Sequence, residues 1–376
     1  MKKAKMFFAV LMVAALVLSL ASCNEKKNDT TGSSQDTSGG SPETSTTSSE
    51  PDTGTAGGVK PVILVISFGT SYNDNRELSI GAIEADIAAK FPNYEIRRAF
   101  TSQIIIDILK DRDKINIDNV KEAMDRLVAD GVKEVIIQPT HVMNGFEYND
   151  VVDEVRSYKD KFETLKFGKQ LLASNADYED VVKAMQSAMK AHDDGNTAFV
   201  LVGHGSEHPA NIAYTRLQNE FKEADLKQYF IGTVEAEPSY DEVLEALKES
   251  GYKKVVLAPF MVVAGDHANN DICGEEDDAW MTMLKKEGFE VVPHVEGIGQ
   301  IAEIRDIYVR HVESAISTPA IVGPVTGEHL NAGTYTGIEV ASSSSMFKII
   351  DCRLDVAEDG SMTAVLTLNG KGYGKL

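Results

Sequence analysis

The side chains with the clearest chemical potential in this sequence are histidines that stand in glycine-rich stretches. His204 lies in a Gly-His-Gly-Ser run, His267 in an Ala-Gly-Asp-His run, and His141 precedes Glu147 on the same short segment. Each histidine taken alone is as well explained by a local hydrogen bond. Taken together with the carboxylate of Glu147, the three imidazoles favour a metal site or an acid–base site.

The ligand types narrow the chemistry without naming one ion. Imidazole and carboxylate favour first-row divalent ions such as Co²⁺, Ni²⁺, Fe²⁺ or Zn²⁺. The spacing is not that of a helical zinc-protease motif. The turn 67–71 could cradle a phosphate but lacks the lysine of a P-loop, and the run 203–206 is not a serine-hydrolase elbow. The acidic run 275–278 could bind cations, although a solvated helix start explains it better.

Buried strands that alternate with helices should position these side chains. Continuous apolar or β-branched runs predict strands at 62–66, 134–138, 198–202 and 254–258. Apolar residues at helical spacing predict helices at 78–90, 119–130, 178–191 and 239–249. This alternation predicts an α/β fold of right-handed βαβ units around parallel sheets.

The core of the chain repeats itself. Segment 65–71 matches 201–207, and 131–139 matches 251–259, with Glu147 paired to His267 further on. Two unrelated α/β units with similar strand ends are the alternative, but two matches in the same order favour duplication. We therefore expect two similar lobes that face one another, an N-terminal one at 59–175 and a C-terminal one at 176–315.

A cleft between the lobes is the expected place for chemistry, because ligands of open α/β sheets bind outside the carboxyl ends of the strands. We expect His204, His267 and Glu147 to act there as catalytic groups. Phe68 follows the first strand, and we expect it to contact a substrate together with His141 and Glu147. His204, with a glycine on each side, stands where backbone can approach a ligand closely.

The first residues have the features of an export signal. Three lysines precede an apolar run at 6–20, which is too short for a membrane span. The run ends in Leu-Ala-Ser-Cys and resembles a bacterial lipobox, which predicts a signal peptide at 1–22 and lipidation of Cys23. An ordinary signal with a chance cysteine is the alternative. Residues 23–58 are rich in Ser and Thr and predict a disordered tether to the outer face of the cytoplasmic membrane.

The C-terminal residues 317–376 alternate like strands and predict a small β-rich appendage. Because the sequence stops at Leu376 without a closing element, a truncated chain is one interpretation. Cys273 and Cys352 are expected to be a buried thiol and a strand residue, with an extracellular disulfide as the alternative.

Composition excludes several classes of protein. Hydrophobic residues make up 43% of the chain and charged residues 25%, as in ordinary soluble proteins and unlike multi-span membrane proteins. The 37 Lys and Arg against 58 Asp and Glu give a net charge of −21, which argues against nucleic-acid binding. The oligomeric state stays open, with a homo-oligomer among the alternatives.

Several segments resemble the anaerobic sirohydrochlorin cobaltochelatases, which belong with the class II chelatases and have ferrochelatase among their wider kin. The resemblance covers about 59–315 and rests on segments 65–72, 98–102, 141–148, 203–205 and 257–271. It implies that a divalent ion is inserted as substrate into a tetrapyrrole lying between the lobes, with no organic cofactor. Co²⁺ is the favoured ion, with Fe²⁺ or Ni²⁺ as alternatives.

The resemblance also implies roles for single residues. Its metal ligands fall on His204, Glu235 and His267, and a further cleft glutamate falls on Glu147, with His141 near it. Export and lipid anchoring depart from the cytoplasmic members of the family. A surface-anchored lipoprotein that binds haem, another tetrapyrrole or a metal without turnover is therefore the alternative function.

Overall fold

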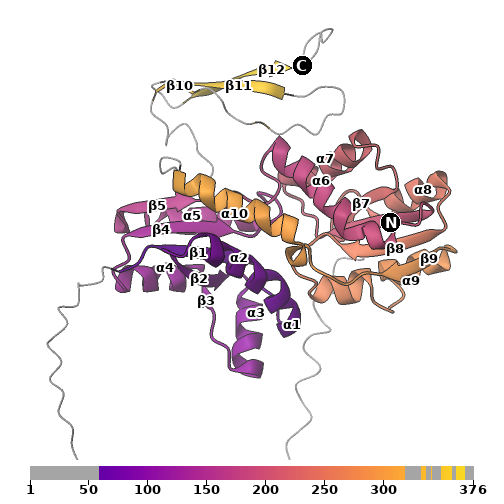
Figure 1. Cartoon of the computed structure of the whole chain (residues 1–376), viewed down its shortest axis with the longest axis horizontal. Coiled ribbons are helices and arrows are strands. Elements are labelled where there is room, and N and C mark those ends of the chain that lie inside the picture. The colour runs from indigo at the N-terminus through magenta and orange to yellow at the C-terminus, as the bar shows by residue number, and fades with distance from the viewer. Residues whose placement is uncertain (1–58, 318–331, 336–339, 341–348, 358–360, 369–376) are drawn as a thin grey trace, which may run out of the picture. The chain divides into compact units, whose positions relative to one another are not determined.

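The computed structural model describes residues 59–317, 332–335, 340, 349–357 and 361–368 (Figure 1). The predicted signal peptide, Cys23 and the tether lie outside these residues. No helix in the described part of the chain combines the length and the apolar character that crossing a membrane requires.

The first sheet is parallel throughout and has the strand order β3-β2-β1-β4-β5. Its strands are β1 (Val62–Ser67), β2 (Glu95–Phe100), β3 (Asp118–Asn119), β4 (Glu134–Pro139) and β5 (Thr164–Phe167). Every residue of β1 is buried, because this central strand has helices over both of its faces.

The second sheet repeats this arrangement with the order β7-β6-β8-β9. Its parallel strands are β6 (Thr197–Gly203), β7 (Tyr229–Thr233), β8 (Lys254–Pro259) and β9 (Glu290–Pro293). In each sheet the central strand pairs with a strand that ends in proline, Pro139 in the first and Pro259 in the second. The predicted α/β fold with parallel sheets is confirmed.

Helices flank both sheets (Figure 1). They are α1 (Asn73–Arg76), α2 (Ala82–Lys90), α3 (Gln103–Ile108), α4 (Val120–Ala129), α5 (Phe146–Arg156), α6 (Asn175–Met189), α7 (Ile212–Glu223), α8 (Tyr240–Ser250), α9 (Trp280–Lys286) and α10 (Ala302–Ser317). Reciprocal side-chain caps begin α4, α6 and α8. The helix predicted at 78–90 begins earlier, at Asn73, and passes through a π-helical turn at Glu77–Gly81 that buries Ser79 and Ile80.

Helix α10 joins the two sheets into one body. Although α10 follows the second sheet in sequence, it packs against strand β4 of the first sheet and against helices α2 and α6 (Figure 1). The hydroxyl of Tyr308 donates to the Thr140 carbonyl at 2.8 Å, and Lys166 donates to the Ile316 carbonyl at 2.6 Å. A continuous apolar core contains residues of both sheets and of α10, so neither lobe closes its core alone.

A buried ion pair fixes α10 on α6. His311 Nε2 lies 3.0 Å from Asp177 Oδ1, and its Nδ1 lies 3.1 Å from the Lys169 carbonyl. Burial by itself raises the pKa of Asp177, but the hydrogen bond and charge of His311 and the hydrogen bonds of Ser174 outweigh it and hold that pKa below its usual value.

The C-terminal residues form a small antiparallel sheet with the order β10-β11-β12, which confirms the predicted β appendage. Its strands are β10 (Gly333–Tyr335), β11 (Ile349–Val356) and β12 (Met362–Leu368). Cys273 and Cys352 both carry free thiols, so the alternative disulfide is not formed in this structure.

The Asp177–His311 pair predicts a pH-dependent stability. Because the folded state lowers the pKa of Asp177, the pair stabilises the fold fully above about pH 4 and loses this effect as the pH falls through the lowered pKa. We expect Asp177→Asn to reduce the free energy of unfolding by about 1–3 kcal/mol near neutral pH. The difference from the wild type should shrink on acidification.

Urea unfolding of both proteins over an acid-to-neutral pH series measures this difference. Glu179→Gln, on the exposed side of α6, is the matched control and should change stability by less than about 0.5 kcal/mol. A difference between wild type and Asp177→Asn that stays constant across the series would contradict a role for the Asp177 charge.

Candidate functional site

A compact group of side chains that could hold a metal ion lies in the second lobe. One ligand atom from each of His204, Glu235 and His267 lies within 4.8 Å of the other two, and among the described residues no other such trio occurs. The two imidazole rings are 4.6 Å apart between centroids and nearly perpendicular, at 86°. His204 Nδ1 lies 3.7 Å from Glu235 Oε2, too far for a good hydrogen bond. This is the arrangement of ligands that can converge on one ion.

Three neighbouring strands deliver these ligands. His204 directly follows β6, Glu235 follows β7, and His267 stands on the loop after β8. The main-chain hydrogen bonds of the sheet continue past the strand ends, because the Glu235 N–H donates to the His204 carbonyl at 2.9 Å. All three residues therefore lie beyond the carboxyl ends of neighbouring parallel strands, where ligands of open α/β sheets bind.

Glycines allow the backbone at His204 to approach its neighbours closely. A Cβ at Gly203 would lie 2.2 Å from Tyr214 Cε1 on α7. Gly205 has a φ of +85°, and a Cβ there would lie 2.8 Å from the Ala236 backbone nitrogen. Any larger residue at either position would push His204 away from the strand that supplies Glu235.

Hydrogen bonds select the free nitrogen of each histidine. His267 Nδ1 lies 2.6 Å from Oδ2 of Asp271, one helical turn further along the chain. His204 Nδ1 lies 2.9 Å from the Gly205 carbonyl. In both rings Nδ1 therefore carries the proton that is donated, and Nε2 keeps the lone pair that a metal ion needs.

His141 and Glu147 form a second polar pair at the carboxyl end of the first sheet. His141 follows β4 and Glu147 lies in the first turn of α5, with Nε2 and Oε2 3.8 Å apart. The His141 side chain is 9% exposed, and neither nitrogen has a hydrogen-bond partner among the described residues. Burial lowers the pKa of His141 to about 4, so the ring is neutral at physiological pH.

Glu147 is electrostatically linked to the metal centre. Burial raises the pKa of its carboxyl group, while the charge of His204 acts in the opposite direction. Glu147 of the first lobe thus interacts electrostatically with His204 of the second lobe. The predicted site residues thus form two groups. His204, Glu235 and His267 make up one, and His141 and Glu147 make up the other.

Aromatic side chains are exposed at the strand ends of the first sheet. Phe68, just after β1, is 45% exposed, and Phe146, at the start of α5, is 58% exposed. Phe146 makes an edge-to-face contact with His208 of the second lobe, at 4.7 Å between ring centroids. Phe68 therefore offers an open apolar face, and its predicted contact with substrate stays a prediction.

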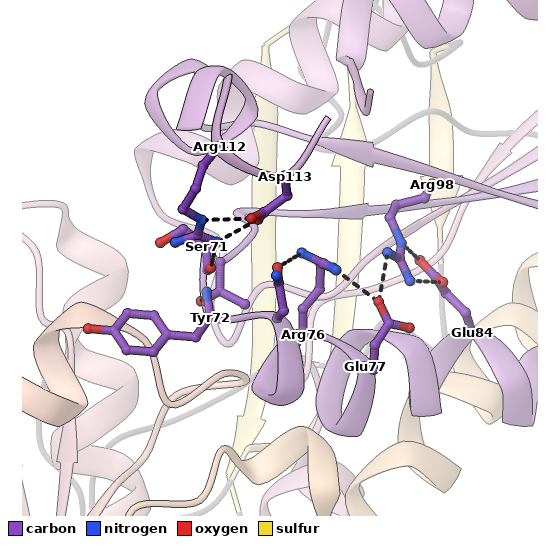
Figure 2. A network of polar contacts seen from close by, with 10 residues as sticks. Ser71, Tyr72, Arg76, Glu77, Glu84, Arg98, Arg112 and Asp113 are labelled. Atoms are coloured by element: carbon purple, nitrogen blue, oxygen red, sulfur yellow. Dashed lines mark hydrogen bonds and ion pairs between the residues drawn. The ribbon is translucent and has the colours of Figure 1, made fainter. Parts of the chain in front are cut away.

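A polar network holds the loop that carries Phe68 and Tyr72 (Figure 2). The guanidinium of Arg112 donates to the Ser71 carbonyl and pairs with Asp113 at 2.6 Å, while Tyr72 points away from these groups. The same network continues through Arg76, Glu77, Arg98 and Glu84. The loop is thus held by hydrogen bonds and ion pairs within the first lobe.

The loop that carries His267 is anchored across the lobes. Asn75 Oδ1 accepts a hydrogen bond from the Ala264 N–H at 2.7 Å and another from Ser79 Oγ at 3.3 Å. A Cβ at Gly265 would lie 3.3 Å from Thr70 Oγ1. The first lobe therefore helps to set the position of a metal ligand that belongs to the second.

Sequence reasoning assigned no role to Asn75 or Asp271, and it reached Glu235 only through the family resemblance. Asp271 had a usable signal, because it stands four residues after His267 in a segment that turns as a helix. Asn75 had none, since a lone amide at the start of a helix follows no pattern that indicates a contact with a distant loop.

Two parallel-sheet lobes with a His–His–Glu centre at the strand ends define a chelatase-type protein. The same fold occurs in SirB from Bacillus subtilis with Fe³⁺, which matches with a TM-score of 0.50 and 16% identity over 69% of this chain and 96% of that chain. At this identity the likeness concerns the fold alone.

The chain belongs to the cobalt chelatase (CbiK) family, whose model matches residues 61–317. The sirohydrochlorin cobaltochelatase of Salmonella typhimurium is 37% identical over 259 residues, which are 69% of this chain and 97% of the relative. The sirohydrochlorin cobaltochelatase CbiKC of Nitratidesulfovibrio vulgaris is 30% identical over 260 residues, 69% of this chain and 91% of the relative. The family predicted from the motifs is confirmed.

The Asp271–His267 hydrogen bond predicts a measurable effect on metal binding. In the native protein the Asp271 carboxylate orients the His267 ring and makes it a stronger ligand. Asp271→Asn removes this charged acceptor. We expect Co²⁺ to bind about 10–100-fold more weakly, as for other carboxylates that support a metal-bound histidine. Calorimetric titration with Co²⁺ in the absence of tetrapyrrole measures the change.

Asp277→Asn is the matched control, because it removes the same charge from an exposed residue that pairs only with Lys286 among the described residues. Equal losses of affinity in the two variants would show that net charge, and not the hydrogen bond to His267, is responsible.

Proposed function

We propose that this protein inserts Co²⁺ into sirohydrochlorin or a closely similar tetrapyrrole at the His204–Glu235–His267 centre. The observation that carries the proposal is the convergence of these three ligand atoms within 4.8 Å in a chain of the cobalt chelatase family. The names of two relatives supply the tetrapyrrole. Fe²⁺ and Ni²⁺ are alternative substrates, because two imidazoles and a carboxylate accept any of these ions.

The reaction exchanges one divalent ion for two pyrrole N–H protons, so charge is balanced when both protons leave the macrocycle. The neutral imidazoles of His204 and His267 hold the ion through Nε2, and the Glu235 carboxylate offsets part of its charge. Because His204 and Glu235 are exposed and His267 is half-buried, the ion can pass from these side chains to the pyrrole nitrogens.

Glu147 is the proposed proton acceptor. Its pKa is raised by burial, which makes it a stronger base than an exposed glutamate while it stays within the field of His204. Once the ion has moved to the macrocycle, His204 and His267 are also free to take up a proton. The two kinds of group would thus act at successive stages of the same exchange.

His141 is the proposed contact for a polar group of the substrate. Its buried nitrogens have no partner in the described part of the chain, and buried polar atoms of this kind are normally satisfied. With a pKa of about 4 the ring does not hold a proton at neutral pH, so it serves as a hydrogen-bonding group and not as the base. Phe68 would pack against the apolar face of the macrocycle.

Location is a separate part of the proposal. The lipobox-like sequence that ends at Cys23 supports an exported protein, anchored by lipid to the outer face of the cytoplasmic membrane. At that surface the protein would meet tetrapyrroles from outside the cell. Capture of haem or another tetrapyrrole without metal insertion is therefore the alternative function.

The insertion reaction is predicted to depend on the metal ligands. The full chain is mixed anaerobically with sirohydrochlorin and Co²⁺, and separately with Fe²⁺ or Ni²⁺, and insertion is followed by the absorbance change of the macrocycle. We expect the His204→Ala, His267→Ala variant to be slower by at least about a hundredfold, because it loses both the ion and a proton acceptor. Glu235→Gln should also be slow.

Glu237→Gln is the matched control for Glu235→Gln, because Glu237 stands two residues away and bonds to the Ser239 backbone instead of the metal trio. A spectral shift on tetrapyrrole binding, with no insertion above the background of the double variant for any ion, would overturn the enzyme and favour capture.

Lipid anchoring predicts a change in where the protein is found. Cys23→Ala removes the only sulfur that the lipobox-like sequence offers for acylation. We expect the variant to leave the membrane fraction and to lose incorporation of a labelled fatty acid, both measured after expression in bacterial cells. A Cys23→Ala variant that stays acylated and sediments with membranes would contradict this part of the proposal.

A further inference from the structure

A second pair of histidines lies away from the insertion centre along the chain. His192 ends the short turn Lys190–His192 after α6, and His294 directly follows β9. Their rings meet edge to face, with centroids 5.4 Å apart and an angle of 71° between the planes. The carboxylate of Glu296 lies beside His294, with Oε2 3.5 Å from His294 Nε2.

Two of these separations agree with the dimensions of a metal site, whereas His192 must move closer to complete it. With bonds of about 2.0–2.1 Å, two imidazoles on one tetrahedral ion have centroids about 5 Å apart, and a nitrogen and an oxygen ligand lie about 3.4 Å apart. At the insertion centre the two ring centroids are 4.6 Å apart. The His294–Glu296 distance exceeds that of a good hydrogen bond, as expected for two groups that leave room for an ion between them.

The surroundings offer further donors and space. His294 and Glu296 line a cavity of about 270 Å³, together with Met185 and Met189 of α6. Thioether sulfur is a soft ligand, which favours transition-metal ions over Mg²⁺ or Ca²⁺. Room in the cavity allows water to complete the coordination of an ion.

We propose that His192, His294 and Glu296 form a second site, which binds a divalent transition-metal ion of the class that the insertion centre uses. Among the described residues only the insertion trio has all its ligand atoms within 4.8 Å, so the second site must close around its ion. His192 is partly exposed at the end of a helix, and a change of its rotamer is an inexpensive way to do so.

The second site is connected to the insertion centre by backbone hydrogen bonds. Ile298 N–H donates to the Met261 carbonyl at 2.8 Å, and Gly299 N–H donates to the Val262 carbonyl at 3.0 Å. The segment that bears His294 therefore supports the loop that bears His267. An ion bound at the second site would make the segment of His294 more rigid, and with it the loop of His267.

Co²⁺ alone is the probe for this site, with the full chain purified without a histidine tag and no tetrapyrrole present. We expect the wild type to bind about two equivalents with the visible absorption of nitrogen-ligated Co²⁺, and the His204→Ala, His267→Ala variant to keep about one. Adding His192→Ala and His294→Ala should abolish the remaining absorption. Glu296→Gln should weaken the second equivalent about tenfold or more.

Glu290→Gln, exposed on β9, is the matched control for Glu296→Gln and should leave both equivalents in place. The proposal is overturned if the His204→Ala, His267→Ala variant binds no Co²⁺ with nitrogen-ligand absorption, or if it keeps its equivalent after the second pair is removed. Should the fourfold variant fail to fold, His192→Asn is added to the His204→Ala, His267→Ala variant instead. If His192→Asn leaves the Co²⁺ affinity of that variant unchanged, the proposed site is overturned. These measurements of Co²⁺ binding do not require insertion activity, so their outcome is independent of the test of the proposed function.

Discussion

All strands of a parallel sheet end at the same edge, and the candidate metal centre of this protein depends on that constraint. The hydrogen bond from the Glu235 N–H to the His204 carbonyl extends the main-chain ladder of β6 and β7 beyond the strands. Two ligands are thereby held as neighbours before any ion binds, and the loop after β8 adds His267. Ligands that are already in place lose little freedom on binding, which leaves more of the interaction energy for the ion.

Support for the centre comes from outside the second lobe as well. Asn75 fastens the loop of His267 to the first lobe, and Arg112 donates to the Ser71 carbonyl in the loop of Phe68 and Tyr72. The walls of the site are therefore set by polar side chains that never touch the ion. Such contacts explain how a site made of loops can keep a defined shape while its own residues stay exposed enough to exchange an ion.

The buried strands and the strand-end histidines could be predicted from sequence because burial on both faces demands an uninterrupted apolar run. β1, β6 and β8 have such runs; His204 stands where β6 stops, and His267 stands on the loop after β8. Glu235 follows a short strand and has no histidine beside it, so only family resemblance reached it. The contact of Asn75 with Ala264 joins residues far apart in sequence through geometry that no local pattern encodes.

Helix α10 gives the molecule a particular order of assembly. One face of the first sheet is completed by Tyr308 and Val312, whose side chains belong to the same apolar core as Ile63 and Ile136. During synthesis the first half of the chain is made long before these residues leave the ribosome. Until then this face is covered only in part, by α2, whose Ile83 and Ile87 belong to the same core. The apolar core that the two sheets share can therefore be completed only after the last helix of the chain has been made.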